Sequence, residues 1–290
     1  YRAASSSKMG HAIPSKKNGY LRGRVHYKTS KITPAMTDQQ GHVKHTIEKG
    51  LATITFYHPS HNSLPGYLLA ELANTVTQLG QNENVRIILI KSAGDRTFCA
   101  GASFDELISI EDFATGKEFF MGFARVINAL RTCGKITIGR IQGKAVGGGV
   151  GLCSAVDYAM GTKYSSVRLS ELAVGIGPFV VGPAVERKIG QASFAQMTLN
   201  PSEWQTASWA KDRGMLAEAF DSTEQLDEYI EVFTQKLLSY NPEALKAIKQ
   251  VIWSGTEDWD QLLEERAEIS GQLILSEYAK NAIGKFKNKA

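Results

Sequence analysis

Two glycine-containing turns hold residues that could support chemistry. The first turn includes Ala100, Gly101 and Ala102, and the second has three consecutive glycines from Gly147 to Gly149. Each turn follows an apolar run typical of a strand and precedes residues typical of a helix. Small side chains at such a junction let backbone N–H groups approach a ligand, and a helix N-terminus favours an anion. The two turns together favour a site for a developing negative charge.

Neither turn matches the common nucleotide-binding loops. Gly143-Lys144 lacks the following Ser or Thr of a P-loop and the upstream glycine at the required spacing. The dinucleotide fingerprint is also absent, because Leu152 stands where its third glycine would be. These turns therefore give no support for a nucleotide cofactor.

Glu171 is the candidate acid or base. It follows the strand-like Val167–Leu169 and precedes the apolar stretch Leu172–Val174. A carboxylate among apolar neighbours has a raised pKa, which suits proton transfer near neutral pH. The alternative, from these residues alone, is a surface glutamate in an amphipathic turn.

Other residues give weaker signals for chemistry. His58 and His61 are three residues apart, but Pro59 prevents a helix there and no third metal ligand follows. Cys99 is expected to be a small packing residue, because no histidine-rich motif adjoins it. We therefore expect no metal site.

The composition is typical of a globular protein with one large core. The chain has 290 residues, of which 43% are hydrophobic and 21% charged, and its net charge is +4. No run of 18 apolar residues occurs, so we expect no membrane partner. Residues 1–35 hold eight Lys or Arg and no acid, which leaves 25 basic against 29 acidic residues elsewhere. The charge therefore gives no support for a nucleic-acid partner.

Two features bear on the cellular location. The three cysteines form no C-x-x-C pair, which favours a reducing compartment. Residues 1–41 are expected to be disordered, and they are basic and serine-rich without the apolar core of a secretory signal. We favour Met36 as the natural start and a cytoplasmic protein. The alternative is a transit peptide that directs the chain to the mitochondrial matrix.

The elements that must position these residues alternate between strand and helix from residue 42 onward. The predicted strands are a hairpin within 42–57 and single strands over 85–90, 136–141 and 156–160. The predicted helices cover 68–79, capped by Gly80, and also 113–130 and 147–155. Such alternation implies βαβ crossovers and a mostly parallel sheet.

The pattern changes after residue 200. Helices are predicted over 203–211, 223–239, 242–252 and 258–276, with no strong strand between them. The predicted organisation is thus an α/β core over 42–200 and a helical C-terminal region over 201–290. Trp204 and the other tryptophans are expected on helical faces, in the core or in subunit contacts.

Several of these segments resemble the crotonase, or enoyl-CoA hydratase/isomerase, superfamily. Phe98–Ala102 resembles the family's F-C-A-G-A-D element, Ala145–Gly149 its A-x-G-G-G element, and Leu169–Gly175 its Q-P-E-x-x-x-G element. Matches continue elsewhere, so that the resemblance spans residues 42–289. It implies the crotonase fold, a spiral ββα-type core with mostly parallel sheets, followed by a helical C-terminal region.

The resemblance assigns roles to the candidate residues. It implies that the backbone N–H groups of Ala102 and Gly148 form an oxyanion hole for a thioester enolate, with Glu171 as the proton carrier. It also implies further substrate contacts, from Ala100, Gly101, Gly147, Phe179, Phe286 and Lys289. The last two would lie along coenzyme A and neutralise its phosphate.

The resemblance also implies the ligands and the assembly. The substrate would be an unsaturated acyl-CoA, with coenzyme A entering only as part of the substrate and with no metal or redox cofactor. Family members usually form homotrimers or dimers of trimers, so a homotrimer or homohexamer is expected.

Gly151 departs from the family pattern. Family hydratases carry a second glutamate there, so that one carboxylate activates water while the other protonates Cα. A single glutamate can still lift a proton from one carbon and return it to another, which favours an isomerase that converts a 3-enoyl-CoA into the 2-enoyl form. A hydratase remains open if water is activated by Glu171 itself, or by Asp105 or Glu106.

Three other functions remain as alternatives or are disfavoured. A branched or carboxylated enoyl-CoA such as 3-methylglutaconyl-CoA could be the substrate of a hydratase. A catalytically degenerate crotonase-like module that binds CoA or RNA is permitted by Gly151 but disfavoured by the retention of Glu171. A hydrolase of 3-hydroxyisobutyryl-CoA is disfavoured because Phe179 stands where such enzymes need an Asp.

Overall fold

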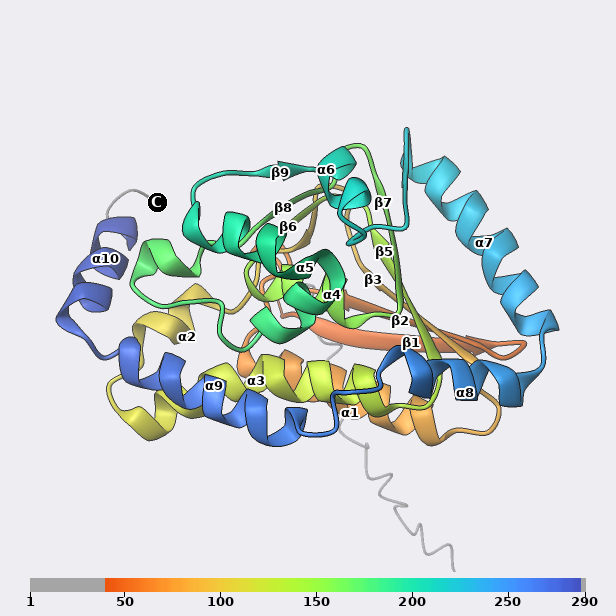
Figure 1. The fold of residues 1–290 in the computed structure, drawn as a ribbon, viewed down its shortest axis with the longest axis horizontal. Helices are drawn as coiled ribbons and strands as arrows, with labels where there is room; N and C mark the ends of the chain where they lie inside the picture. Colours follow the sequence, from red (N-terminus) through yellow and green to blue (C-terminus); the bar gives the residue numbers. More distant parts are fainter. Residues whose placement is uncertain (1–39, 288–290) are drawn as a thin grey trace, which may run out of the picture. The chain divides into compact units, whose positions relative to one another are not determined.

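The structure is a computed structural model that describes residues 40–287, and its main element is a six-stranded sheet. Neighbouring strands follow the order β1-β2-β3-β5-β7-β10 (Figure 1). The β1–β2 pair is antiparallel and the other four pairs are parallel. The strands are β1 His42–Glu48, β2 Leu51–Tyr57, β3 Ile87–Ser92, β5 Ile136–Ile141, β7 Tyr158–Thr162 and β10 Glu218–Phe220.

A second sheet of four short strands carries the two glycine turns. Its order is β4-β6-β8-β9, and only the β8–β9 pair is antiparallel. The strands are β4 Thr97–Cys99, β6 Lys144–Val146, β8 Ser166–Arg168 and β9 Gln205–Thr206. The mostly parallel α/β architecture expected from the sequence is confirmed.

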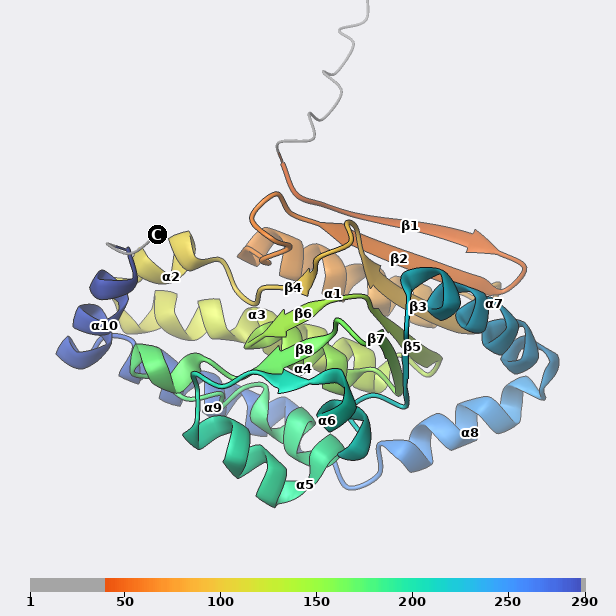
Figure 2. The ribbon, with the colours of Figure 1, turned by 90° about the horizontal axis from the view of Figure 1, so that it is seen from above.

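Helices cover both faces of the large sheet, which explains why β3 and β5 are buried along nearly their whole length. On one face, α1, α3 and α9 lie side by side and share a core with β2, to which Phe56, Leu68, Ile127 and Leu263 contribute (Figure 1). On the other face, α7 and α8 cover residues such as Ile87 and Ile138 (Figure 2). The helices are α1 Gly66–Gln81, α2 Phe104–Ile108, α3 Phe113–Thr132, α4 Gly148–Ala155, the 3₁₀ turn η1 Glu171–Val174, α5 Gly182–Leu199, α6 Ala207–Asp212, α7 Thr223–Ser239, α8 Pro242–Ile252, α9 Trp259–Leu273 and α10 Glu277–Lys287. Among these helices, none is long and apolar enough to cross a membrane.

Helix α10 packs against η1, the short turn that begins with Glu171. An added Cβ atom at Gly175, which ends η1, would lie 2.7 Å from Cδ1 of Tyr278 and 3.0 Å from Cα of Ala279. Ile176, Ala279 and Ile283 share a small apolar core with residues that follow α9. The C-terminal helix therefore covers the segment that carries the candidate acid or base.

Two predicted helix boundaries are wrong. Gly80 does not cap α1, which continues to Gln81. An added Cβ atom at Gly80 would lie 2.6 Å from the carbonyl oxygen of Cys133, so this glycine permits close packing within the helix. The helix expected over 203–211 begins only at Ala207, and Trp204 precedes β9 outside any helix.

Two further features were not predicted. Helix α5 is interrupted at Gly190, where φ is 77°, and this break weakens the helical periodicity on which the prediction depends. The region after residue 200 also contains strands, because β9 joins the small sheet and β10 pairs with β7 in the large sheet. The C-terminal region, where no strong strand was expected, therefore contains two short strands that extend the sheets of the core.

A buried ion pair fastens α8 to the sheet. Lys249 Nζ lies 2.8 Å from Oδ2 of Asp157, and both side chains are 2% exposed. The same carboxylate accepts hydrogen bonds from the indole of Trp253 at 2.6 Å and from the N–H of Thr137 at 2.7 Å. Lys249 Nζ also donates to the carbonyl of Leu130 at 2.7 Å. The cluster therefore joins α3, β5, β7 and α8.

We expect Lys249→Met to lower the free energy of unfolding by about 3–5 kcal/mol, because it leaves a buried carboxylate without its cation. Lys246→Met, an exposed position on the same helix, serves as the control and should stay within about 0.5 kcal/mol of the wild type. Urea unfolding measures both. Equal stability of the two variants would contradict a structural role for the pair.

Candidate active site

Strands β4 and β6 bring the two glycine turns together. The strands are parallel neighbours, so the turns that follow them meet at the same edge of the small sheet. Gly101 has a φ of 90° and Gly147 a φ of 52°, values that favour glycine. An added Cβ atom at Gly101 would lie 2.9 Å from the carbonyl oxygen of Val146 and 3.5 Å from the nitrogen of Gly148. The two turns therefore contact each other through bare backbone.

The N–H groups of Ala102 and Gly148 have no partner in this arrangement. Gly148 is the first residue of α4, where an N–H has no acceptor within the helix. Ala102 forms a bridge with Leu64, but there the Leu64 N–H donates to the carbonyl of Gly101 at 2.8 Å. Neither N–H donates in any turn, loop or cap hydrogen bond of residues 40–287. Two free donors on touching turns have the character that an oxyanion hole requires.

Neighbouring groups explain why the second turn has no side chains. An added Cβ atom at Gly148 would lie 2.2 to 2.5 Å from three ring atoms of Phe123 on α3. At Gly149 it would lie 2.3 Å from the carbonyl oxygen of Cys99. Because Gly148 and Gly149 have no Cβ atoms, α4 can pack closely on its neighbours and the N–H of Gly148 stays exposed.

Glu171 lies beside the second turn because β8 is the neighbour of β6. The N–H of Gly147 donates to the carbonyl of Arg168 at 2.9 Å, at the end of β8. An added Cβ atom at Gly147 would lie 2.9 Å from Oε1 of Glu171. The carboxyl group thus contacts the turn that carries the Gly148 N–H.

Burial controls the ionisation of Glu171. The residue as a whole is partly exposed, but its Oε2 atom is shielded from solvent and has no hydrogen-bond partner. The loss of water raises the pKa of Glu171 to about 7, and backbone groups of Glu171 and Ser170 oppose this more weakly. Near neutral pH the group can therefore both accept and donate a proton.

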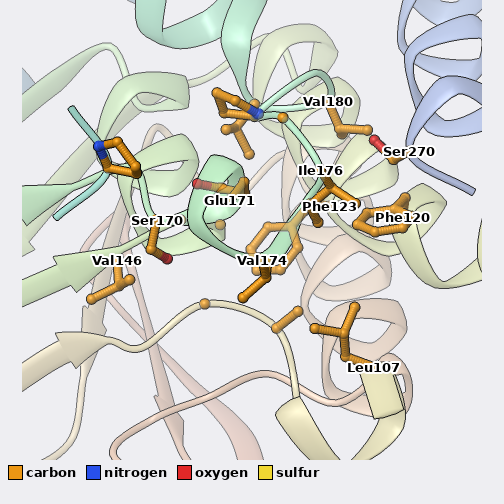
Figure 3. Close-up of a pocket in the computed structure, with 18 of the residues that line it drawn as sticks. Leu107, Phe120, Phe123, Val146, Ser170, Glu171, Val174, Ile176, Val180 and Ser270 are labelled. Carbon is orange, nitrogen blue, oxygen red and sulfur yellow. The ribbon is translucent and has the colours of Figure 1, made fainter. Parts of the chain in front are cut away.

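One cavity of about 390 Å³ joins the two turns and Glu171. Figure 3 shows Glu171 between Val146 and Ser170 on one side and Leu107 and Phe120 on the other. The wall beyond Glu171 on the second side is mostly apolar and comes from α2, α3, α9, η1 and the segment after η1. Its side chains include Leu107, Phe120, Phe123, Val174, Ile176, Val180 and Ser270.

Val181 fills the space that a side chain at Gly151 would need. An added Cβ atom at Gly151 would lie 2.5 Å from Cγ1 and 2.9 Å from Cβ of Val181. Gly151 does not line the cavity, whereas Val181 does. A second carboxylate therefore has no room at this position while Val181 keeps its place.

Asp105 and Glu106 do not line the cavity. Both lie in the first turn of α2, which Ser103 caps, and Oε2 of Glu106 accepts the N–H of Gly66 at 2.8 Å. Their position fits the structural role of acids at a helix start. Cys99 is buried, which raises the pKa of its thiol to about 12 and keeps it protonated.

Seven of the nine predicted site residues line the cavity: Ala100, Gly101, Ala102, Gly147, Gly148, Glu171 and Phe179. Phe286 lies in α10, and Lys289 falls outside the described residues, so their contacts with coenzyme A stay predictions. Among residues 40–287, no three His, Cys, Asp or Glu side chains gather to hold a metal ion.

Phe123 and Arg168 are two of the cavity residues that were not predicted from the sequence. Phe123 is one of several aromatic residues on α3, and nothing in the sequence distinguishes it from its neighbours. Arg168 is a cation at the end of a strand three residues before Glu171. That charge, next to a candidate catalytic residue, was a usable signal.

Comparisons with known proteins show which family the chain resembles. A family model described as enoyl-CoA hydratase/isomerase matches residues 46–289. A probable enoyl-CoA hydratase of Bacillus subtilis is 24% identical over 84% of this chain and 94% of its own length. A peroxisomal Delta(3,5)-Delta(2,4)-dienoyl-CoA isomerase of Arabidopsis thaliana is 26% identical over 89% of this chain and 93% of its own length.

The fold is also that of solved members of this group. The structure of an enoyl-CoA hydratase from Bacillus halodurans superposes with a TM-score of 0.78 at 20% identity, over 84% of this chain and 99% of that one. The predicted crotonase fold is therefore confirmed.

The buried Glu171 predicts how stability depends on pH. The folded chain keeps a proton on Glu171 up to a pKa of about 7, whereas an unfolded glutamate releases it near 4.5. The stability from this group is therefore complete below about pH 4.5 and is lost as pH rises to about 7. Relative to Glu171→Gln, the wild type should lose at most about 3 kcal/mol between these values.

Urea unfolding of both proteins between pH 5 and pH 8 checks this dependence, with the exposed Glu186→Gln as the control. A constant stability difference between the wild type and Glu171→Gln across this range would show that burial does not shift the pKa.

Proposed function

This chain belongs to the enoyl-CoA hydratase/isomerase family, and we propose that it moves the double bond of an unsaturated acyl-CoA from carbon 3 to carbon 2. The observation that carries this proposal is that Val181 fills the space that a side chain at Gly151 would need. Hydration by two carboxylates needs a second one on α4, and Val181 occupies its place. One carboxylate of pKa near 7 is sufficient to carry a proton between two carbons.

The proposed reaction begins with the thioester carbonyl in the oxyanion hole. The N–H groups of Ala102 and Gly148 donate to the carbonyl oxygen, and this lowers the barrier to enolate formation. The Glu171 carboxylate removes a proton from carbon 2, and the electrons of that C–H bond form a dienolate with the double bond between carbons 3 and 4. Glu171 then returns the proton to carbon 4, which leaves the double bond between carbons 2 and 3.

The apolar wall of the cavity supports this sequence of steps. It excludes water from the carboxyl group, so that Oε2 has no partner and the proton stays on the group between the two steps.

We expect Glu171→Gln to lower kcat for 3-hexenoyl-CoA by roughly 10³-fold, with KM nearly unchanged, because the amide cannot carry the proton. Ultraviolet absorbance of the conjugated thioester product measures the rate. Turnover of crotonyl-CoA by hydration should be much slower than isomerisation in the wild type. A wild type that hydrates crotonyl-CoA faster than it isomerises 3-hexenoyl-CoA would contradict the proposal.

The pH profile follows from the role of Glu171 as a base. The free enzyme must have a carboxylate to remove the first proton, so kcat/KM should rise with pH and level off above about 7. The measurement is kcat/KM for 3-hexenoyl-CoA between pH 5 and pH 9. A profile without a transition in this range would exclude Glu171 as the base.

Substitutions at Gly151 test the single-carboxylate site directly. We expect Gly151→Glu alone to lower the free energy of unfolding by about 1–3 kcal/mol, because its side chain overlaps Val181. The double variant Gly151→Glu/Val181→Ala should recover part of this loss and should hydrate crotonyl-CoA faster than either single variant. Urea unfolding and a hydration assay measure these effects. An unchanged stability of Gly151→Glu would show that Val181 does not occupy the position.

A further inference from the structure

Arg168 is the one Lys or Arg among the cavity-lining residues in the described part of the chain. It ends β8 in register with Val146 on β6, and its carbonyl accepts the N–H of Gly147. In Figure 3, Val146 and Ser170 lie on the side of Glu171 away from Leu107 and Phe120. Arg168 therefore lines the cavity beside Val146, and its backbone is bonded to the glycine turn.

The positive charge of Arg168 has no acidic partner among residues 40–287. No Asp or Glu oxygen lies within 4.0 Å of its guanidinium, and its Nε is shielded from solvent without a hydrogen-bond acceptor. Burial lowers the pKa of Arg168, and no neighbouring carboxylate opposes this shift. Nor does Arg168 contribute to the pKa of Glu171, which is set by loss of water. The guanidinium is thus free to bind an anion that the protein itself does not supply.

Trp204 holds the guanidinium in place and brings a second cation to the same region. The centroid of the Trp204 ring lies 4.4 Å from Cζ of Arg168 and 5.1 Å from Nζ of Lys144. Stacking on an aromatic face fixes the plane of the guanidinium and leaves its N–H edge available for a carboxylate. Lys144 is exposed and does not line the cavity, whereas Arg168 does.

We propose that Arg168 binds a carboxylate carried by the acyl part of the substrate, so that the preferred substrates are monothioesters of unsaturated dicarboxylic acids. This inference rests on the proposed function, in which the thioester lies between Ala102 and Gly148. The phosphates of coenzyme A are separated from the thioester by the whole pantetheine arm. That separation exceeds the reach of Arg168, whose backbone is bonded to the glycine turn itself. An anion at Arg168 therefore belongs to the acyl group, and a guanidinium binds a carboxylate through two parallel hydrogen bonds.

A binding experiment tests this without turnover. Adipoyl-CoA and hexanoyl-CoA have the same chain length and lack the double bond, and isothermal titration gives their affinities for the wild-type protein. We expect adipoyl-CoA to bind at least about 10-fold more tightly, as a charged hydrogen-bonded pair predicts. Equal affinities in the wild type would overturn the proposal, whatever the outcome for the isomerase reaction.

Variants assign the preference to Arg168. Arg168→Gln should remove the advantage of adipoyl-CoA and leave hexanoyl-CoA within about 2-fold, while Arg168→Lys should retain part of the advantage. Lys144→Gln is the matched control, since it removes the other cation on Trp204, and it should preserve the preference. An equal loss for both ligands in a folded Arg168→Gln protein would assign the guanidinium to the pantetheine part and overturn the proposal.

A kinetic experiment separates this inference from the proposed function. In Arg168→Gln, kcat/KM for 3-hexenedioyl-CoA should fall at least about 10-fold more than kcat/KM for 3-hexenoyl-CoA. In Glu171→Gln, both substrates should lose activity together. If Arg168→Gln lowered kcat/KM equally for both substrates while Glu171→Gln lowered both as expected, the carboxylate site alone would be refuted.

Discussion

The contact between two stretches of bare backbone is the constraint on which the rest of this structure depends. Gly101 approaches the carbonyl of Val146 and the nitrogen of Gly148 so closely that no side chain fits between them. Phe123 presses on Gly148 from α3. The parallel pairing of β4 with β6 brings these turns together, and the position of α3 requires that Gly148 have no side chain. The lack of side chains here also leaves the N–H groups of Ala102 and Gly148 without partners. The packing that stabilises the fold therefore also creates the site.

The carboxyl groups of Asp157 and Glu171 have contrasting surroundings, which suit a structural role for Asp157 and proton transfer by Glu171. Asp157 receives donors from Lys249, Trp253 and Thr137, so its negative charge is compensated on every side. Glu171 has an oxygen without a donor and a wall of apolar side chains. The donors around Asp157 hold its side chain in place, whereas desolvation without a partner keeps the two protonation states of Glu171 close in free energy near pH 7. The contrast lies in the surroundings, since both side chains are carboxylates.

Local patterns in the sequence predicted much of the fold, and they named residues that the structure brings together around one cavity. The apolar runs of β3 and β5, the helical spacing of α3 and α7, and the short motif around Glu171 each contain their own signal. The sequence could not show that Val181, thirty residues from Gly151, fills its space, because that contact depends on how α4 and α5 pack. The strand β10 was missed for a similar reason. Three residues form a strand only because β7 offers them an edge.

The packing of α10 on η1 has a consequence for synthesis of the chain on the ribosome. Glu171 leaves the ribosome more than 100 residues before Tyr278 and Ala279, which press against Gly175 at the end of its own turn. The strand β10, at the edge of the large sheet, is also late in the chain. Domains form as units once their residues are available. A nascent chain that ends before α10 therefore leaves this face of η1 uncovered, and the shielded environment of Glu171 is complete only after α10 has been synthesised.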